Sequence, residues 1–565
     1  MVKSARTLSG RVVDRFWSWL GRFEPVGLAV GLLFYCWSMS PSLLPRPWYL
    51  QAAATGISVA SGYGVGVLAV WGLRKCGLTR QWSERWRRFG WYGLGLTAVV
   101  VVPLFLFLGS WWQDITRELV GFEKGSSWDY PGVFVLGAVV FVVLVFAGRG
   151  LRKLANTLTR VAGRIVPEPV ARGAAVAVVA LVVVLATQGL LSTGISRISN
   201  GSASASDAGS APGVEQPTES QRSGSPDSRQ PWDSLGKEGR TFVAGGPRSD
   251  DIESVIGAPA LEPIRVYSGR ASVDADGLGL GLQTVESLAD NVVDELDRTG
   301  AFDRKYLAIA TTTGRGWVNE SVASSLEYLA GGDTAIAAIQ YSFLPSPLAF
   351  LADRATPLLA GRALFEAVYE RWRTLPEDQR PALLTFGESL GSYGGQDAFS
   401  GVQDMITRTS GALWVGTPNF SEQWARVTQS RDPGSREILP VIYGGENVRF
   451  AATPEDLEGP ALGDWGSPRI VYWQHPSDPI VWWSPDLVLR QPDWLTEPRG
   501  ADVDKGMTWI PFVTFWQVTL DMVFAADVPD GHGHSYGAEA TYYWNDILGL
   551  SDDTLVEKVV DALNA

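Results

Sequence analysis

The chain has 565 residues, more than one ordinary domain holds, and its charge is divided unequally along its length. Residues 1–239 contain 24 Lys and Arg against 14 Asp and Glu, whereas residues 240–565 contain 23 against 46. A basic first half and a strongly acidic second half predict two environments. The acidic half argues against nucleic-acid binding, which needs a basic surface. With two cysteines and three histidines, the sequence predicts neither a metal site nor a cofactor.

The first half contains a succession of apolar stretches, each close to the roughly 20 residues that a helix needs to cross a membrane. No long polar segment separates them, which argues against core helices of a soluble domain. We predict a multi-pass helical membrane domain over residues 1–198, with about five spans, of which the first is marginal. The predicted spans are 26–42, 51–73, 90–112, 132–148 and 173–191.

Basic residues concentrate in alternate loops of this predicted membrane domain. The N-terminal tail and the loops after the second and fourth spans are rich in Arg and Lys, whereas the loops after the first and third spans are not. Loops with an excess of Arg and Lys stay in the cytoplasm. Five spans then place the N-terminus in the cytoplasm and everything after residue 192 outside it.

A change of composition separates the membrane domain from the second half. Residues 199–239 begin with a Ser-, Gly- and Pro-rich segment that has few large apolar residues, which predicts a flexible linker. In residues 240–565 short β-branched runs alternate with helical patterns, which predicts a mainly parallel sheet flanked by helices. The predicted strands are 264–267, 307–311, 335–341, 382–386, 412–415 and 470–474, and the predicted helices are 284–298, 321–329, 361–373 and 538–547.

The motif GESLG at 387–391 follows one of these strands directly. A serine in a G-x-S-x-G motif between a strand and a helix lies on a sharp turn that exposes its hydroxyl, so Ser389 is the candidate nucleophile. A second match, GHSYG at 533–537, follows a poor strand, and no histidine comes after it. Ser535 therefore lacks a base in the expected chain order, and Ser389 is preferred.

An acid and a histidine base are expected after the nucleophile in the chain. Asp478 lies in the loop beyond the last predicted strand and is the candidate acid, although an Asp before a proline also caps turns; Asp486 is the reserve. His532 and His534 both lie in the late loop before the predicted helix at 538–547. We favour His534, which is closer to that helix, and leave His532 open as the base.

Two further features of the predicted site follow from the same chain order. The backbone amides of Leu390 and Thr313 are the candidate oxyanion donors, because they follow the nucleophile and an early strand, respectively. Insertions at 420–468 and 485–506 are rich in Trp and Pro, and we expect them to cover the pocket.

Several motifs in both halves carry a resemblance to a known family. They are SLLPR at 42–46, PIRVY at 263–267, TGRGW at 313–317, QYSFLPS at 340–346, the GESLG motif and GHGHSY at 531–536. In these motifs the chain resembles a bacterial family of multi-pass, membrane-anchored α/β-hydrolase-like proteins, over nearly its whole length apart from the linker. The resemblance implies an α/β-hydrolase fold on a membrane anchor in the bacterial cytoplasmic membrane.

These observations predict a serine hydrolase, esterase- or lipase-like, that cleaves an ester of a lipid or cell-envelope molecule on the outer side of the membrane. Two alternatives stay open. The first is a serine-dependent acyltransferase, in which an alcohol takes the place of water as the acyl acceptor. The second is a non-catalytic membrane protein with a binding or transport-linked role on a hydrolase scaffold. The expected partners are the lipid bilayer and a lipid or envelope ester. The acyl and alcohol parts of the substrate and the oligomeric state are not predicted.

Overall fold

The computed structural model describes residues 22–78, 83–125, 129–197, 207, 209–273, 280–344 and 353–565, which form two compact units. The helical unit comprises Met1–Val182 and Ser484–Phe524, and the sheet unit comprises Val183–Trp483 and Ala525–Ala565. Each unit is thus built from two separate stretches of chain. The predicted fold class, a helical region followed by a parallel sheet flanked by helices, is confirmed.

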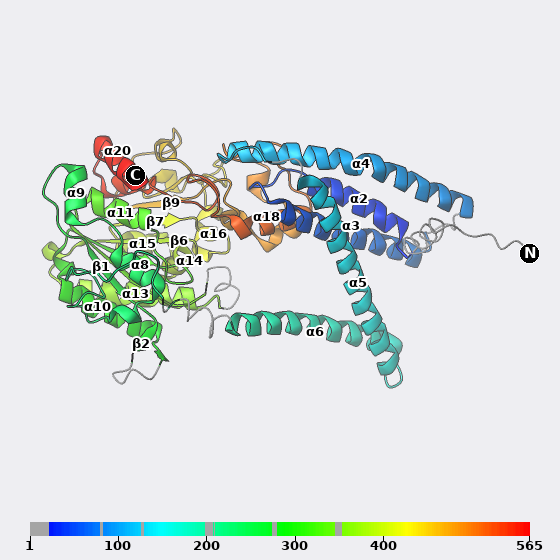
Figure 1. Ribbon diagram of the computed structural model, residues 1–565, viewed down its shortest axis with the longest axis horizontal. Coiled ribbons are helices and arrows are strands. Elements are labelled where there is room, and N and C mark those ends of the chain that lie inside the picture. Colours follow the sequence, from blue (N-terminus) through cyan, green and yellow to red (C-terminus); the bar gives the residue numbers. More distant parts are fainter. Residues whose placement is uncertain are drawn as a thin grey trace, which may run out of the picture. The chain divides into compact units, whose positions relative to one another are not determined.

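Long helices dominate the helical unit (Figure 1). They are α2 (Pro25–Ser38), α3 (Trp48–Lys75), α4 (Glu84–Leu119) and α5 (Tyr130–Ala162), with α6 (Glu168–Arg197) running across the unit boundary. Among the described residues three helices are long and apolar enough to cross a membrane, namely α3, α5 and the Arg88–Leu119 part of α4. The helix α2 is shorter, and the side chains of α6 after residue 182 lie outside the described residues. Five spans therefore stay a prediction.

Glycines bring three of these helices into close contact. A Cβ atom on Gly66 of α3 would lie 2.8 Å from the Cα atom of Gly27 on α2. On the same helix, a Cβ atom on Gly56 would lie 2.7 Å from the carbonyl oxygen of Gly137 on α5. Small residues at such points are typical of helices that associate inside a membrane, where close backbone approach replaces the hydrophobic effect.

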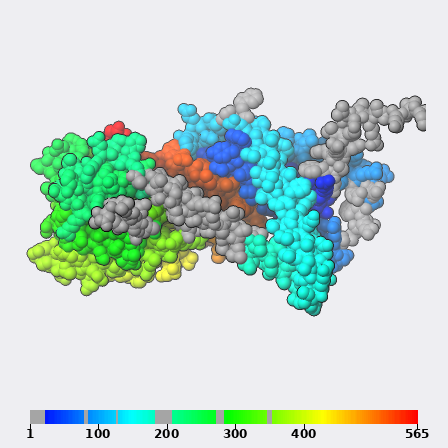
Figure 2. Space-filling view, turned by 60° about the horizontal axis from the view of Figure 1, so that its bottom comes forward, coloured from blue at the N-terminus to red at the C-terminus, as the bar shows by residue number. Residues whose placement is uncertain are grey.

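The later stretch of the helical unit packs on these helices through α18 (Val513–Asp521), which contacts α2 and α3 and is seen in orange beside the blue helices in Figure 2. Asp521 is fully buried, accepts a hydrogen bond from the Ser42 hydroxyl and lies 3.4 Å from Nε of the buried Arg46. The Gln517 amide donates to the carbonyl oxygen of Ser40 at 3.0 Å. The first and last residues of the SLLPR motif thus bind a carboxylate from the second half of the chain.

The sheet unit contains a seven-stranded sheet in which all neighbouring strands are parallel. Its order is β1-β5-β4-β6-β7-β9-β8. The strands are β1 (Ile264–Ser268), β4 (Tyr306–Thr311), β5 (Thr334–Ile339), β6 (Ala382–Glu388), β7 (Gly411–Val415), β8 (Val448–Ala451) and β9 (Arg469–Trp473), with β2 (Ala271–Val273) and β3 (Leu280–Leu282) as a separate antiparallel pair. The six predicted strands are confirmed, and β2, β3 and β8 were missed.

Helices cover both faces of this sheet, as a buried parallel sheet requires. One face is covered by α10 (Val285–Thr299), α13 (Thr356–Arg373) and α14 (Leu390–Gly395). The opposite face is covered by α8 (Gly236–Ala244), α11 (Glu320–Leu329), α19 (Ala540–Leu548) and α20 (Asp553–Asn564), whose apolar side chains form one core cluster with the strands. The remaining helices of this unit are α9 (Ser249–Ile256), α15 (Val402–Arg408), α16 (Glu422–Gln429) and α17 (Pro479–Trp482).

The structure differs from the predicted linker over 209–239, which is packed against the sheet. Arg222 is fully buried, and its guanidinium donates to backbone carbonyls of the following helix and loop. The Ser223 amide donates to the carbonyl oxygen of Arg265 on β1 at 3.0 Å. Backbone hydrogen bonds and one buried arginine order a segment that has few apolar side chains. The predicted linker residues 199–206 and 208 lie outside the described residues.

The two predicted insertions belong to different units. The segment 420–468 contains α16 and β8, and β8 extends the sheet at its edge beyond β9. The segment 485–506 belongs to the helical unit. Its apolar and aromatic residues therefore contribute to packing in that unit.

Replacing Asp521 with Ala should destabilise the helical unit, because Arg46 would stay buried without its counter-charge. Breaking a buried ion pair in this way costs about 3 to 5 kcal/mol. Thermal unfolding of the full chain in detergent measures the loss. Asp486→Ala is the matched control from the same stretch, since its side chain is 72% exposed and an exposed pair contributes at most about 1 kcal/mol. Equal losses in both variants would contradict a stabilising role for the Arg46–Asp521 pair.

Candidate active site

Ser389 lies between β6 and α14 in a backbone conformation that L-residues rarely adopt, with φ 55° and ψ −120°. The neighbouring glycines make this turn possible. A Cβ atom on Gly387 would lie 2.5 Å from the carbonyl carbon of Gly391, and one on Gly391 would lie 2.1 Å from the carbonyl oxygen of Thr311. Strain of this kind at a strand-to-helix turn is typical of a nucleophile elbow. The turn leaves Ser389 partly exposed.

Asp478 and His534 form a hydrogen-bonded pair. His534 Nδ1 lies 2.6 Å from Asp478 Oδ2, and the carboxylate is fully buried. The Tyr536 hydroxyl donates to the same oxygen at 2.7 Å, and the Ile480 amide donates to Oδ1 at 2.8 Å. Because a carboxylate only accepts hydrogen bonds, Nδ1 carries the proton and Nε2 of the neutral ring is left as the basic nitrogen.

The nucleophile turn and the histidine meet at the end of β7. The Ser389 amide donates to the carbonyl oxygen of Val415 at 3.0 Å. The next residue, Gly416, has φ 52°, and a Cβ atom there would lie 2.6 Å from His534 Cε1. The strands β6, β7 and β9 are neighbours in the sheet. Ser389 and Asp478 follow β6 and β9, and His534 reaches the same edge from a later loop, beside Gly416 after β7. His534 Nε2 is buried and has no hydrogen-bond partner within the described part of the chain.

The structure separates the other candidates from this group. The Ser535 hydroxyl donates to Asp530 at 2.6 Å, and the described element before its loop is a short 3-10 helix at Met522–Phe524, where an elbow needs a strand. His532 lies near Glu539, where burial raises the pKa of the carboxyl and the charge of His532 partly opposes that rise. It is His534 that contacts Asp478. Asp486 lies in the helical unit with an exposed side chain. Of the two histidines left open by the sequence, the geometry selects His534.

The predicted oxyanion donors have different outcomes. Leu390 is the first residue of α14, where the amide has no partner within the helix. The Thr313 amide, however, donates to the carbonyl oxygen of Trp317 at 3.0 Å, which closes the loop on itself. Thr313 is therefore not a free donor, and this prediction was wrong. The preceding residue, Thr312, has no backbone hydrogen bond from its amide among the described residues and lies beside Gly391, which makes it the alternative candidate donor.

A second carboxyl group, which the sequence analysis missed, lies beside the pair. Glu388 is the variable residue of the GESLG motif, and only its place next to the nucleophile could have pointed to it. It is 8% exposed and accepts a hydrogen bond from the Asn319 amide. Burial raises its pKa to about 7, although the charge of His534 and the Asn319 bond act in the opposite direction. Near neutral pH this carboxyl therefore changes its charge beside the imidazole.

The protonation of His534 reflects both carboxyl groups. Burial by itself lowers the pKa of the ring, but the contact with Asp478 and the nearby Glu388 outweigh burial and raise it. The Tyr536 ring packs edge-on to His534, and it stacks on His475 with the ring centres 4.3 Å apart. Tyr536 thus fixes both the carboxylate and the imidazole, a role that nothing in the sequence pattern suggested.

Comparison with known families places both halves of the chain in one family. Residues 264–559 match the model of a family described as the alpha/beta-hydrolase family, and residues 39–247 match one described as the N-terminus of that family. No curated protein and no solved structure matches the chain significantly.

Glu388→Gln should stabilise the protein in a pH-dependent way. The folded state holds the Glu388 proton more tightly than the unfolded state, so the stability of the unmodified protein falls as pH rises from about 4.5 and the full cost is present above about 7. The neutral amide avoids this cost, which amounts to about 3 kcal/mol. We expect the gain in thermal unfolding at about pH 8 and none near pH 4. Glu377→Gln, with a side chain 92% exposed, is the control. A gain that does not vary with pH would contradict the buried-acid explanation.

Proposed function

The chain belongs to the alpha/beta-hydrolase family, and we propose that it is a serine hydrolase that cleaves ester bonds with Ser389 as its nucleophile. The observation that carries this proposal is the hydrogen bond between His534 and the buried Asp478, beside a serine on a strained turn. A serine hydroxyl is a weak nucleophile unless a base takes its proton, and the base needs a third group to orient it. These three side chains supply the three functions.

In the proposed mechanism His534 Nε2 takes the proton of the Ser389 hydroxyl as its oxygen attacks the ester carbonyl. Asp478 holds the imidazole in the required tautomer and stabilises the imidazolium that forms. The amides of Leu390 and Thr312 stabilise the developing oxyanion. The imidazolium then gives its proton to the leaving alcohol, and water, activated by the same ring, releases the acid from Ser389.

We propose a lipid or cell-envelope ester as the substrate. Three helices long and apolar enough to cross a membrane belong to the same chain as the proposed active site. A permanent anchor of that size keeps an enzyme at a membrane surface, where lipid esters are concentrated and soluble esters are not. The alternation of basic loops supports a location of the sheet unit on the outer side of the cytoplasmic membrane.

Ser389→Ala should abolish labelling of the detergent-solubilised full chain by a fluorophosphonate, which reacts only with activated serines. Ser535→Ala, the matched control, should leave the labelling rate unchanged. His534→Ala should slow labelling by about 10³-fold or more, because a serine without its base loses most of its reactivity. Persistent labelling of Ser389→Ala, or none of the folded unmodified protein, would remove the catalytic proposal and favour a binding role.

The proposed topology predicts the accessibility of Cys76, which is exposed just after α3. In spheroplasts a membrane-impermeant maleimide should leave Cys76 unlabelled until the membrane is permeabilised. The experiment uses the Cys36→Ser variant, in which Cys76 is the one remaining cysteine of the chain. Glu377→Cys on the sheet unit, in a Cys36→Ser, Cys76→Ser background, should be labelled without permeabilisation. The reverse pattern would place the sheet unit in the cytoplasm.

A further inference from the structure

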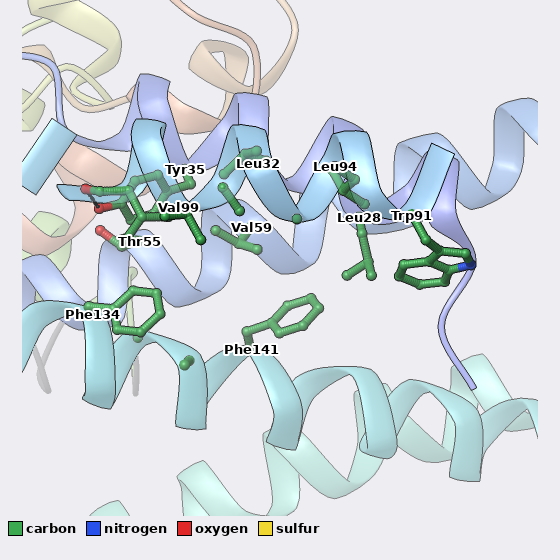
Figure 3. Close-up of a pocket in the computed structure, with 15 residues that line it drawn as sticks. Leu28, Leu32, Tyr35, Thr55, Val59, Trp91, Leu94, Val99, Phe134 and Phe141 are labelled. Carbon is green, nitrogen blue, oxygen red and sulfur yellow. Dashed lines mark hydrogen bonds between the residues drawn. The ribbon is translucent and has the colours of Figure 1, made fainter. Parts of the chain in front are cut away.

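The helical unit contains an elongated cavity of about 560 Å³ between α2, α3, α4 and α5 (Figure 3). Its walls are almost entirely aliphatic and aromatic. Trp91 lies at one end, and Tyr35 and Thr55 lie at the other. The volume is within the range of about 300 to 1,000 Å³ that is usual for small-molecule sites.

The cavity runs parallel to the helices. Its wall on α4 extends from Trp91 to Val102, which corresponds to a rise of about 16 Å. On α5 the wall extends from Phe134 to Phe141. The space is therefore long and narrow, a shape that suits an extended chain better than a compact ring system.

Small residues keep this space open. Gly95 and Ala98 on α4, and Gly137 and Ala138 on α5, contribute to its walls. A Cβ atom on Gly95 would meet no atom within 4 Å, so no other helix approaches this point of α4. A longer side chain at residue 95 would therefore extend into the cavity without touching the backbone.

The hydroxyl groups of Tyr35 and Thr55, at the end of the cavity opposite Trp91, offer few hydrogen-bonding positions to a water molecule. The Tyr35 hydroxyl already donates to the carbonyl oxygen of Val102 at 2.9 Å, and the Thr55 hydroxyl accepts from the Gln51 amide at 3.1 Å. A buried water needs two to four polar partners. An empty space would deprive its walls of dispersion contacts. In a bilayer the available filler with the matching chemistry is a lipid acyl chain.

The Trp91 end of the cavity is the basic end of the unit. The exposed Arg88 lies one helical turn before Trp91 on α4. The guanidinium of Arg149 lies 4.7 Å from the ring centre of Phe23, and Phe23 stacks on Phe141, a wall residue of the cavity. Basic side chains at this level attract anionic lipid headgroups.

We propose that the helical unit binds the acyl chain of an anionic phospholipid in this cavity, with the phosphate at the Arg88 end and the chain extending toward Tyr35. This proposal goes beyond anchoring and does not depend on catalysis at Ser389. It gives the helices a defined ligand site, separate from the general lipid surroundings of a membrane anchor.

Photocrosslinking tests the proposal on the full chain in phosphatidylethanolamine vesicles that contain phosphatidylglycerol with a diazirine at the end of one acyl chain. Crosslinks should concentrate on the peptides that contain Tyr35 and Thr55. Gly95→Leu should reduce them by about tenfold, equivalent to about 1.4 kcal/mol of binding free energy. Ala98→Leu, which fills the same cavity, should do the same.

The matched control is Gly93→Leu on the same helix. A Cβ atom at residue 93 also meets nothing within 4 Å, but Gly93 does not line the cavity. It should leave the crosslinks unchanged, and thermal unfolding shows whether all three variants are folded. Equal crosslinking in folded Gly95→Leu, Ala98→Leu and Gly93→Leu would overturn the site. Competition by unlabelled phosphatidylglycerol should exceed that by additional phosphatidylethanolamine, and equal competition would overturn the preference for an anionic headgroup.

Discussion

A buried carboxylate must be hydrogen-bonded or neutralised, and Asp478 meets this requirement through the bonds that define the site. It accepts from His534, Tyr536 and the amide of Ile480, and it is fully buried. Removing any of these donors would leave the carboxylate charge less compensated. The hydrogen bond that orients the His534 imidazole therefore also stabilises the folded protein. The stacking of Tyr536 on His475 adds a second restraint to the same loop.

A second carboxyl group complicates the electrostatics of this pair. Glu388 immediately precedes the nucleophile, and its charge raises the pKa of His534, as that of Asp478 does. Because Glu388 itself titrates near neutrality, one of the two carboxyl groups beside the imidazole changes its charge near pH 7. The basicity of His534 is therefore coupled to the protonation of a residue in the GESLG turn.

Patterns that arise from one local element could be predicted from the sequence, whereas contacts between distant segments could not. The strand before Ser389 and its glycines have a short-range signature, so the elbow was expected. The choice of His534 over His532 needed the position of Asp478, which lies in a separate loop. Thr313 failed as a donor because its loop closes on Trp317, and the strand β8 was missed because it lies within the Trp- and Pro-rich segment 420–468, which was taken for an insertion. Neither feature has a periodic pattern.

The ion pair between Arg46 and Asp521 has a consequence for biosynthesis. Arg46 leaves the ribosome early, whereas its partner is translated only after most of the sheet unit. During that interval Arg46 lacks its counter-charge, and the surface of α2 and α3 on which α18 later packs is uncovered. Domains usually fold as they emerge from the N-terminus, but here the helical unit cannot reach its final packing until translation is nearly complete. The order of synthesis thus makes the two units finish folding together, and a nascent chain that stops before α18 would be a natural substrate for membrane quality control.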